Sequence, residues 1–319
     1  EHYKMLFRID PKILAYDLHP DYLSTKYALS QEDKKLVGVQ HHHAHIASCM
    51  AENGLSEKVI GIAMDGTGYG IDGNIWGCEF LLADYSGFQR YAHLKYLPMP
   101  SGDMAVKEPY RMALSYLYDA FDGELNNIDI PFIDRIGYKK IDLIKKLIER
   151  SINTPLTSSC GRLFDAVSSL IGIRDVITYE AQSAIELEMI AEHNISDRYG
   201  YEIIDQEELL IIDIKEMFYE IISDLKNGLS KGVISAKFHN TLIDFIATIC
   251  EEIRKTDKDI NKVVLSGGVF QNKYLLDNTI KLLENKEFTT YFHKRIPTND
   301  GGISLGQSVI ANAQLTEDF

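Results

Sequence analysis

The sequence has few cysteines and no long apolar run, and both absences narrow the class of protein. Cys49, Cys78, Cys160 and Cys250 are far apart and form no CxxC pair. This spacing argues against a structural zinc knuckle and favours reduced thiols in a cytoplasmic protein. No apolar run in the chain approaches the roughly 18 residues that a membrane-spanning helix needs. We therefore expect no membrane partner.

Positive charge is also scarce. The 319 residues include 33 basic and 47 acidic side chains, which gives a formal net charge of −14. Such a surface repels the phosphates of nucleic acids, and no basic patch of useful length offsets it, so we expect no nucleic-acid partner. The hydrophobic content is ordinary for a globular protein, and the length fits about two domains or two lobes of one fold.

Histidine, in contrast, is concentrated in one run, Val39-Gln40-His41-His42-His43-Ala44-His45. In a helix, His41 and His45 are i,i+4 neighbours on one face, and their imidazoles can converge on one metal ion. The HExxH helix of zinc enzymes uses the same spacing, although its glutamate is absent here. A partly buried polar cluster is the alternative. The acidic, glycine-rich segment that follows favours the metal.

Hydrophobic periodicity predicts an α/β fold in three parts. In the first part we expect short strands, a histidine helix that ends near Asn53, and a meander that resembles the core of a ribonuclease-H-like lobe. The middle, from Lys107 to Thr256, is mostly helical by periodicity, and the last part returns to strands and helices. The expected strands are 13–17, 37–39, 59–64, 75–83, 88–96, 263–265 and 288–292, and the expected helices include 21–28, 111–121, 141–152, 161–170, 180–193, 215–225, 234–255, 273–285 and 303–313.

Two aspartates stand at the ends of such elements. Asp65 opens the segment Asp65-Gly66-Thr67-Gly68 after a strand, where glycines let the backbone approach a phosphate; a β-hairpin turn is the alternative. Asp300 stands before a helix, where a helix N-cap is the common role. Together with His41 and His45 these carboxylates would form a site with two histidines and two carboxylates, suited to iron or zinc.

Other polar segments are candidates for nucleotide binding. Ser266-Gly267-Gly268 leads to Asn272 between a strand and a helix, so the loop could pass close to a nucleoside, or it could be a tight turn. Asp165 is a candidate ligand for ribose hydroxyls. Glu180 and Gln182 lie on a pattern that is by default a helix surface. Lys107 and Arg111 could contact a phosphate or a carbonyl oxygen, or pair with Glu108 and Asp103.

The motifs together resemble one family, the C-terminal domain of the HypF carbamoyltransferases of [NiFe]-hydrogenase maturation. The resemblance covers essentially the whole chain. It is carried by the strings AYDLHPDYLSTKYA, VQHHHAHIAS, AMDGTGYGIDGNIWGCEF, SGDMAVKEPYRMA, TSSCGRLFDAVSSLIG, YEAQSAIELE, LSGGVFQN and NDGGISLGQ. This domain is similar to O-carbamoyltransferases and to tRNA threonylcarbamoyl-transferase proteins.

The resemblance implies an actin-like, sugar-kinase-like ATPase fold with two ribonuclease-H-like lobes and inserted helices. We place the first lobe, with the metal-binding histidines, at residues 1–106, and the helical insertion and second lobe at residues 107–319. The implied reaction passes the carbamoyl group of carbamoyl-adenylate to the C-terminal cysteine thiolate of HypE and releases AMP. Upstream HypF domains, absent here, would make that donor from carbamoyl phosphate and ATP.

The resemblance also assigns residues to roles. It implies that iron or zinc is held by His41, His45, Asp65 and Asp300, and magnesium is a further candidate cofactor. The AMP moiety would be bound by Gly66, Thr67, Gly68, Asp165, Glu180, Gln182, Ser266, Gly267, Gly268 and Asn272, and the catalytic pair near the carbamoyl-phosphate end would be Lys107 and Arg111. Two positions depart from the family pattern, because Ala181 replaces a usual Gly and Lys107 replaces a usual Arg.

Two other functions are compatible with the motifs. One is an O-carbamoyltransferase of the same fold that uses a small alcohol as acceptor. The other is a docking module for HypE in which the nucleotide is only a structural ligand. An acidic surface fits a protein partner but does not choose among these functions.

Overall fold

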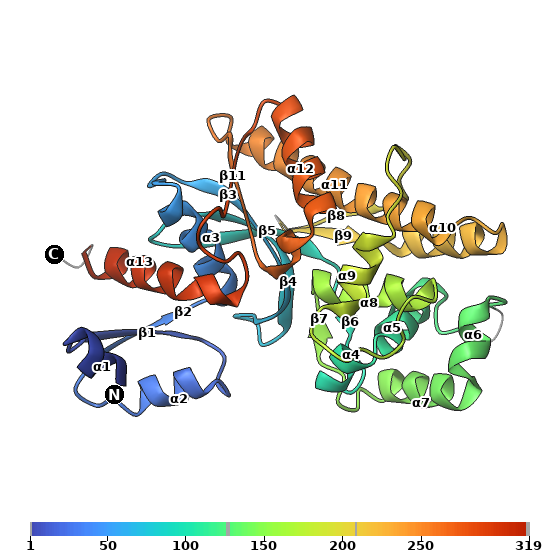
Figure 1. The fold of residues 1–319 in the computed structure, drawn as a ribbon, viewed down its shortest axis with the longest axis horizontal. Coiled ribbons are helices and arrows are strands. Elements are labelled where there is room, and N and C mark those ends of the chain that lie inside the picture. The colour runs from blue at the N-terminus through green and yellow to red at the C-terminus, as the bar shows by residue number, and fades with distance from the viewer. Residues whose placement is uncertain (1, 126–127, 208, 317–319) are drawn as a thin grey trace.

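Two sheets of unequal size organise the chain. The computed structural model describes residues 2–125, 128–207 and 209–316. A small parallel sheet of β1 (Ile13–Asp17) and β2 (Lys35–Val39) lies with α1 (His2–Phe7) and α2 (Leu23–Leu29) at the lower left of Figure 1. The rest of the chain is built around a large central sheet.

The large sheet mixes parallel and antiparallel pairs. Its main path runs β11-β10-β3-β4-β5-β9-β8, and the short strands β6 and β7 attach beside β4. β3, β4 and β5 are antiparallel neighbours, as the meander predicted, whereas β10 pairs in parallel with both β3 and β11. The strands are β3 (Val59–Tyr69), β4 (Ile75–Ala83), β5 (Phe88–Leu94), β6 (Leu97–Pro98), β7 (Leu156–Thr157), β8 (Glu202–Gln206), β9 (Leu209–Asp213), β10 (Lys262–Ser266) and β11 (Thr289–Phe292).

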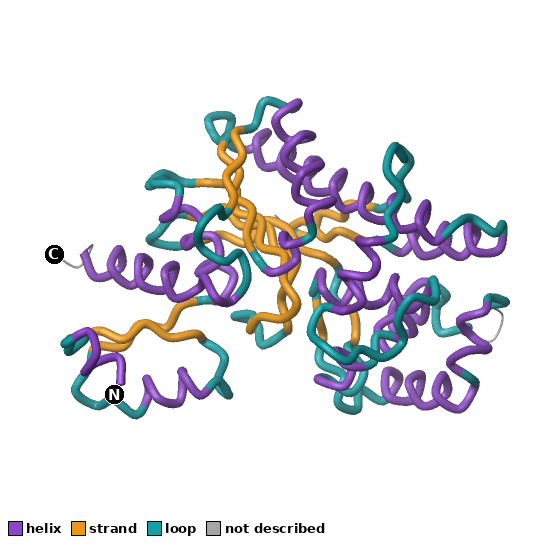
Figure 2. The backbone as a smooth tube through the Cα atoms, in the orientation of Figure 1, coloured by secondary structure: helices purple, strands orange, loops and turns teal. Residues whose placement is uncertain are grey.

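Helices surround this sheet (Figure 2). A group of helices in the middle of the chain forms the right-hand part of Figure 1, and the long α11 runs along the top. The bounds are α3 (His41–Glu52), α4 (Asp103–Lys107), α5 (Tyr110–Ala120), α6 (Pro131–Ile136), α7 (Tyr138–Glu149), α8 (Cys160–Leu170), α9 (Gln182–Met189), α10 (Lys215–Lys226), α11 (Lys231–Thr256), α12 (Lys273–Asn285) and α13 (Ile303–Thr316).

The alternation of side chains along β3 explains why this strand is central. Val59 and Ala63 belong to the cluster that packs on Ile46 of α3, whereas Ile60 and Ile62 belong to the main core on the other face. Successive residues of a strand point to opposite faces, so an unbroken apolar run fits a strand covered on both sides. This burial fixes the register of the strand that carries Asp65.

Helix α13 lies unusually close to α3. A Cβ atom at Gly306 would collide with the carbonyl oxygen of Ala44 and would crowd the backbone nitrogen of Ser48. The hydroxyl of Ser48 also donates to the carbonyl of Gly302, at 2.8 Å. Glycine at position 306 therefore lets the last helix approach the backbone of the histidine helix.

Several expectations about secondary structure were wrong or incomplete. β3 does not end at Met64: its pairing with β4 breaks between Met64 and Gly68 and then resumes through Tyr69, so Asp65 lies in an irregular part of the strand. The middle of the chain is mostly helical, as predicted, but β8 and β9 form an unpredicted hairpin that joins the sheet at β5. Tertiary pairing along β5 supplies hydrogen bonds that a local periodicity does not report.

The predicted domain boundary at residue 106 stays a prediction. The large sheet takes strands from both sides of that residue. Among the helices of the described segments, none combines the length and apolar character needed to cross a bilayer.

Candidate metal centre and nucleotide segments

The histidine run forms the first turn of α3, as predicted. Gln40 is the N-cap, and its side-chain oxygen accepts a hydrogen bond from the backbone N–H of His43 at 2.9 Å. β2 ends directly before this cap, so the small sheet sets where the helix begins. His41 and His45 are buried, with ring centroids 4.9 Å apart.

Two carboxylates from distant parts of the chain face these imidazoles. The Nε2 atom of His41 lies 3.3 Å from Asp65 and 3.6 Å from Asp300. The Nε2 atom of His45 lies 3.3 Å from Asp65 and 3.5 Å from Asp300. Asp65 is buried, whereas the side chain of Asp300 is 58% exposed. One donor atom from each residue lies within 4.8 Å of all the others.

The separations fit a metal ion. Zinc–nitrogen and zinc–oxygen bonds of roughly 2.0–2.2 Å in a tetrahedron place neighbouring donor atoms about 3.3–3.6 Å apart. The four imidazole–carboxylate separations fall in this range, and two nitrogen with two oxygen donors suit zinc or iron. Asp300 is a candidate ligand here, while the neighbouring Asn299 provides the N-cap role by accepting from the N–H of Gly301.

The two histidines and the two aspartates shift one another's pKa values toward the charged forms. Burial lowers the pKa of His41, but hydrogen bonds with Asp17, Asp300 and Asp65 outweigh it and hold this pKa well above 6.5. Burial also opposes the raised pKa of His45, which comes from Asp300 and Asp65. Conversely, the histidines hold the pKa of Asp65 well below 3.8 despite burial, and that of Asp300 at about 2. Protons and a metal ion therefore compete for the same donor atoms of these side chains.

The other two histidines of the run, His42 and His43, lie outside this set of donor atoms. His43 bonds the carbonyl of Asp84 through Nε2 at 2.6 Å, which directs it away from the carboxylates. Burial, followed by the charge of His41, lowers the pKa of His42 to about 3, so His42 is neutral. Its Nε2 atom is buried and has no hydrogen-bond partner among the described residues.

A buried network supports the backbone at Asp65, and sequence reasoning missed it. The hydroxyl of Ser159 bonds the carbonyls of Asp65 and Gly66. Its neighbour Ser158 donates to the carboxylate of Glu79 at 2.6 Å, and Glu79 pairs with Arg90 at 2.6 Å. Burial raises the pKa of Glu79, but the charge of Arg90 outweighs it and keeps Glu79 ionised. A desolvated ion pair therefore holds the Ser158-Ser159 segment, which in turn bonds the irregular part of β3.

The loop that leads to Asp300 is fixed by the far end of α3. Glu52 accepts hydrogen bonds from the backbone N–H groups of Lys294 and Arg295, at 2.9 and 2.6 Å, and from the imidazole of His293 at 2.8 Å. One helix thus carries both candidate histidine ligands at its start and, at its end, an anchor for the loop of the candidate ligand Asp300. Glu52 had no signal in the sequence, because its partners are remote.

The predicted Ser266-Gly267-Gly268 loop lies beside the metal centre. Gly267 has φ of 103°, and a Cβ atom there would collide with the carbonyl of Met64, so only glycine fits. The N–H of Gly268 donates to Asp65 at 3.2 Å. Asn272 is turned inward instead: it caps α12 by accepting from the N–H of Leu275 at 2.8 Å, and it bonds His239 at 2.9 Å.

The candidates on the opposite side come from α8 and the start of α9. Asp165 is buried beside Arg162, at 2.7 Å, and burial raises the pKa of Asp165 despite that charge. Gln182 bonds Thr178 and Glu186. Glu180 is exposed and lies outside the helix that was expected to include it, because Ala181 has φ of 59° and α9 begins only at Gln182. Glycine adopts this left-handed backbone without steric cost, which fits the glycine of the family pattern at this position.

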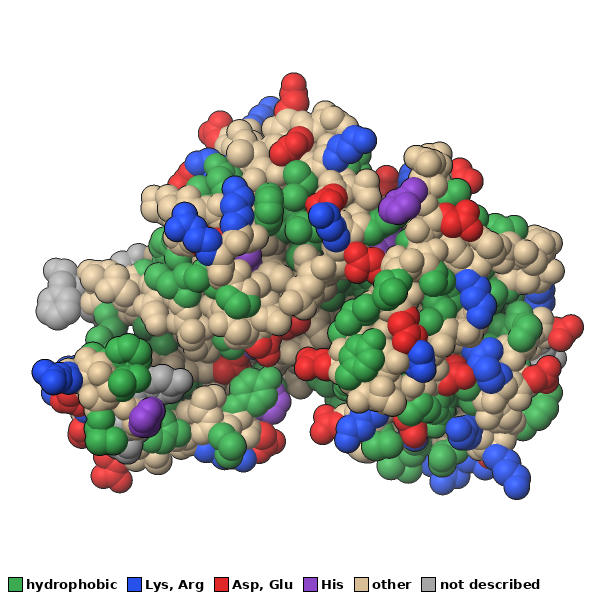
Figure 3. Space-filling model, viewed as in Figure 1, with side chains coloured by type: hydrophobic (Ala, Val, Ile, Leu, Met, Phe, Trp, Pro, Cys, Tyr) green, Lys and Arg blue, Asp and Glu red, His purple; other side chains and the backbone are tan. Residues whose placement is uncertain are grey.

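The two predicted catalytic cations are not part of the metal centre. Arg111 pairs with Glu108 at 2.6 Å, as the salt-bridge alternative predicted. Its second partner is the hydroxyl of Ser101, at 3.0 Å, and not the predicted Asp103. Lys107 is exposed at the end of α4. The space-filling view shows the molecule hollowed between the small sheet and the helices on the right, with acidic side chains inside the hollow (Figure 3).

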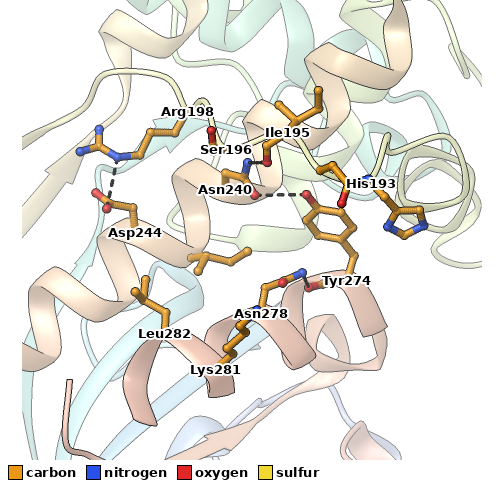
Figure 4. A pocket seen from close by; sticks show the side chains of 12 residues that line it. His193, Ile195, Ser196, Arg198, Asn240, Asp244, Tyr274, Asn278, Lys281 and Leu282 are labelled. Atoms are coloured by element: carbon orange, nitrogen blue, oxygen red, sulfur yellow. Dashed lines mark hydrogen bonds and ion pairs between the residues drawn. The ribbon is translucent and has the colours of Figure 1, made fainter. Parts of the chain in front are cut away.

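A separate cavity of about 490 Å³ lies between α11, α12 and the loop after α9 (Figure 4). Its polar groups bond one another: the hydroxyl of Tyr274 donates to Asn240 at 3.2 Å, and Arg198 pairs with Asp244 at 3.2 Å. None of the predicted site residues lines it. We assign no role to this cavity.

Comparisons with known proteins identify the family of the chain. Residues 61–307 match the family model described as the second subdomain of the carbamoyltransferase Kae1-like domain, and residues 1–52 match the HypF Kae1-like domain. Carbamoyltransferase HypF of Synechocystis sp. is 38% identical over 96% of this chain and 41% of that protein. A HypF homolog of Cupriavidus necator is 33% identical over 95% of this chain and 78% of that protein.

Solved structures give the same result. A full-length HypF in a phosphate- and nucleotide-bound form has a TM-score of 0.92 and 49% identity, and it covers 98% of this chain and 48% of that one. The HypF of T. kodakarensis has a TM-score of 0.84 and 31% identity, over 99% of this chain and 42% of that one. The predicted α/β, actin-like fold is thereby confirmed.

The fold and its matched subdomains define a Kae1-like domain of the carbamoyltransferase class. Within that class, the chain belongs to the HypF family. It spans about two fifths of the length of the first curated relatives that it matches.

Proposed function

We propose that this chain performs the carbamoyl-transfer step: it passes the carbamoyl group of carbamoyl-adenylate to the C-terminal cysteine thiolate of HypE. The observation that carries the proposal is the contact between two candidate subsites. The Ser266-Gly267-Gly268 loop touches Asp65 through the N–H of Gly268, so a nucleotide on the loop would present its acyl end to the donor set of His41, His45, Asp65 and Asp300.

The proposed chemistry is acyl transfer. The thiolate sulfur bonds to the carbamoyl carbon, and the bond between that carbon and the phosphate oxygen breaks, so that AMP leaves with the electron pair. A zinc or iron ion, when bound, supplies Lewis-acid polarisation of a carbonyl oxygen. The protein's own contribution is positioning, because a reacting group held in line with its acceptor avoids much of the entropic cost of the encounter.

The residues divide this work between the two sides of the site. Gly66, Thr67 and Gly68 in the irregular part of β3, with Ser266 and Gly267, present backbone close to the phosphate, while Asp165, Glu180 and Gln182 are proposed to hold the ribose. Asn272 contributes indirectly, because it caps the helix that follows the loop. We propose that Lys107 and Arg111 bind developing negative charge at the carbamoyl end.

The donor must come from elsewhere. In this proposal, further HypF domains make carbamoyl-adenylate from carbamoyl phosphate and ATP, and the product on HypE is a thiocarboxamide. The site would work in the cytoplasm with reduced thiols, and the four cysteines of this chain are free and buried. Magnesium would accompany ATP in the upstream step rather than occupy this nitrogen-containing donor set.

The test is a single-turnover assay with supplied carbamoyl-adenylate. The chain is loaded with zinc or iron and mixed with HypE, and intact-mass spectrometry follows the gain of one carbamoyl group on HypE. We expect transfer that a chelator abolishes, and none to a HypE variant whose terminal cysteine is serine. Transfer to small alcohols but not to HypE would identify an O-carbamoyltransferase. Binding of HypE without transfer would identify a docking module.

A further inference from the structure

Asp17 contacts His41 on the side away from the other candidate ligands. Its Oδ2 atom is 2.7 Å from Nδ1 of His41, on the ring nitrogen opposite to the one that faces Asp65 and Asp300. Both residues are buried, and Asp17 is 2% exposed. We propose that Asp17 is a positioning residue that fixes the tautomer and the ring orientation of His41 for metal binding. This inference rests on the proposed metal centre.

The hydrogen bond determines which nitrogen is free. An ionised carboxylate only accepts hydrogen bonds, so Nδ1 of His41 carries a proton. The proton on Nε2, which faces Asp65 at 3.3 Å, is the one that a metal ion would displace, and Nε2 then offers its lone pair. Nε2 is the atom that belongs to the donor set. Metal-binding histidines commonly donate from their other ring nitrogen to a carboxylate, which orients the ring and makes the ligand nitrogen more basic.

Asp17 is itself held in place by its own strand and turn. Its second carboxylate oxygen accepts from the N–H of His19 at 2.8 Å, and its carbonyl accepts from the hydroxyl of Thr25 at 2.8 Å. In the small sheet, Asp17 pairs in register with Val39, which is followed by the cap and first turn of α3. The same strand pair therefore delivers both the carboxylate and the histidine that it orients.

Asp17 is not a metal ligand in this arrangement. It contacts the far side of the imidazole, and the donor set that converges on one point contains only His41, His45, Asp65 and Asp300. Its removal should weaken the site without removing a ligand. Loss of such an orienting carboxylate typically lowers metal affinity by roughly 10- to 100-fold.

The experiment compares Asp17→Asn with Asp21→Asn, an exposed aspartate of the same small unit that pairs with Lys26. Zn²⁺ affinity is measured on the whole chain by competition with a chromophoric chelator. We expect roughly 10- to 100-fold weaker binding for Asp17→Asn and no change for Asp21→Asn. Asp17→Glu keeps an acceptor and should recover part of the affinity.

A second readout separates positioning from a general loss of structure. Long-range proton–nitrogen spectra of the metal-free chain with labelled histidine, taken where His41 is neutral, should show a proton on Nδ1 in the wild type. The Asp17→Asn variant, whose amide can donate, should lose that preference. Wild-type affinity in Asp17→Asn would overturn this inference alone, and so would an unchanged tautomer. A wild-type chain that binds no metal would overturn the metal centre and this inference together.

Discussion

The candidate metal centre and the pair Lys107 and Arg111, the two ends of the proposed active site, differ in how their polar side chains are satisfied. At the metal end, two imidazoles of α3 and two carboxylates from distant segments converge, and their four nitrogen–oxygen separations are 3.3 to 3.6 Å. At the other end, Arg111 is already paired with Glu108 and Ser101 from its own segment, and Lys107 is exposed.

The difference separates a preformed site from one that needs a ligand to assemble. Converging groups that leave a common space between them fit an ion with little rearrangement, whereas a paired guanidinium must exchange partners to bind a substrate. The metal end also has a buried, charged support, the Glu79–Arg90 pair that bonds Ser158 next to Ser159. The following predictions test whether this contrast is energetic as well as geometric.

The largest effect is expected at that support. Glu79→Gln leaves Arg90 without its buried counter-charge, and breaking such a pair costs about 3–5 kcal/mol of unfolding free energy. Urea unfolding measures it. Glu149→Gln is the control, because its pair with Lys145 is exposed and is worth less than about 1 kcal/mol. Similar losses in both variants would remove the energetic basis of the contrast.

Next in size is the loss of a ligand. His45→Ala should lower Zn²⁺ affinity by roughly 100-fold or more, because three donors remain where four converge. Metal content by mass spectrometry and a chelator competition measure it. His43→Gln is the matched control, a buried histidine of the same helix whose Nε2 bonds Asp84 instead. Equal metal loss in the control would contradict the assignment of His45.

A pH dependence of intermediate size follows from the pKa shifts. The raised pKa values of His41 and His45 stabilise the metal-free fold fully below pH 6.5, and this contribution is lost as pH rises through the raised values. The lowered pKa values of Asp65 and Asp300 stabilise it above pH 3.8, and that contribution is lost as pH falls.

Metal binding has the opposite dependence, because it displaces the protons from the imidazoles. We expect the stabilisation by saturating Zn²⁺ to grow from pH 6 to pH 8, by up to about 1.4 kcal/mol per pH unit for each proton released. Thermal unfolding of chelator-treated and metal-loaded chain at both values measures it. A pH-independent stabilisation would show that neutral histidines already face the metal.

The smallest effect is expected at the other end. Arg111→Ala should cost about 1 kcal/mol or less, because its ion pair with Glu108 is partly exposed, and it should leave Zn²⁺ affinity unchanged. Under the proposed function, carbamoyl transfer should nevertheless slow. A drop in metal affinity in this variant would mean that the two ends are one coupled site.

Local patterns in the sequence predicted a large part of the fold and site. The i,i+4 spacing of His41 and His45 predicted one helix face on which both imidazoles converge, and the structure has their rings 4.9 Å apart. The strand and helix runs placed β1, β4 and α12 within their observed bounds. Glycine with a left-handed backbone at position 267 also agrees with a loop predicted from its glycine pair. These features depend on neighbours in the chain, so the chain order reveals them.

The features that were missed depend on distant partners. Asp17 meets His41 only because β1 pairs with β2, and Glu52 meets Lys294 only after the whole large sheet has formed. The β8–β9 hairpin joins β5 across most of the helical segment. A single sequence contains each of these residues but not their adjacency, which tertiary packing decides.

The sequence positions of the four candidate ligands affect both the synthesis of the chain and the local unfolding of its last helix. His41 and His45 come early, Asp65 follows on the next strand, and Asp300 is reached only on the loop before the last helix. A ribosome must therefore make the chain as far as Asp300 before the ion can have all its ligands. Once bound, the ion closes a loop between the two ends of the domain, much as a cross-link would, so that unzipping α13 from α3 would be opposed by metal occupancy.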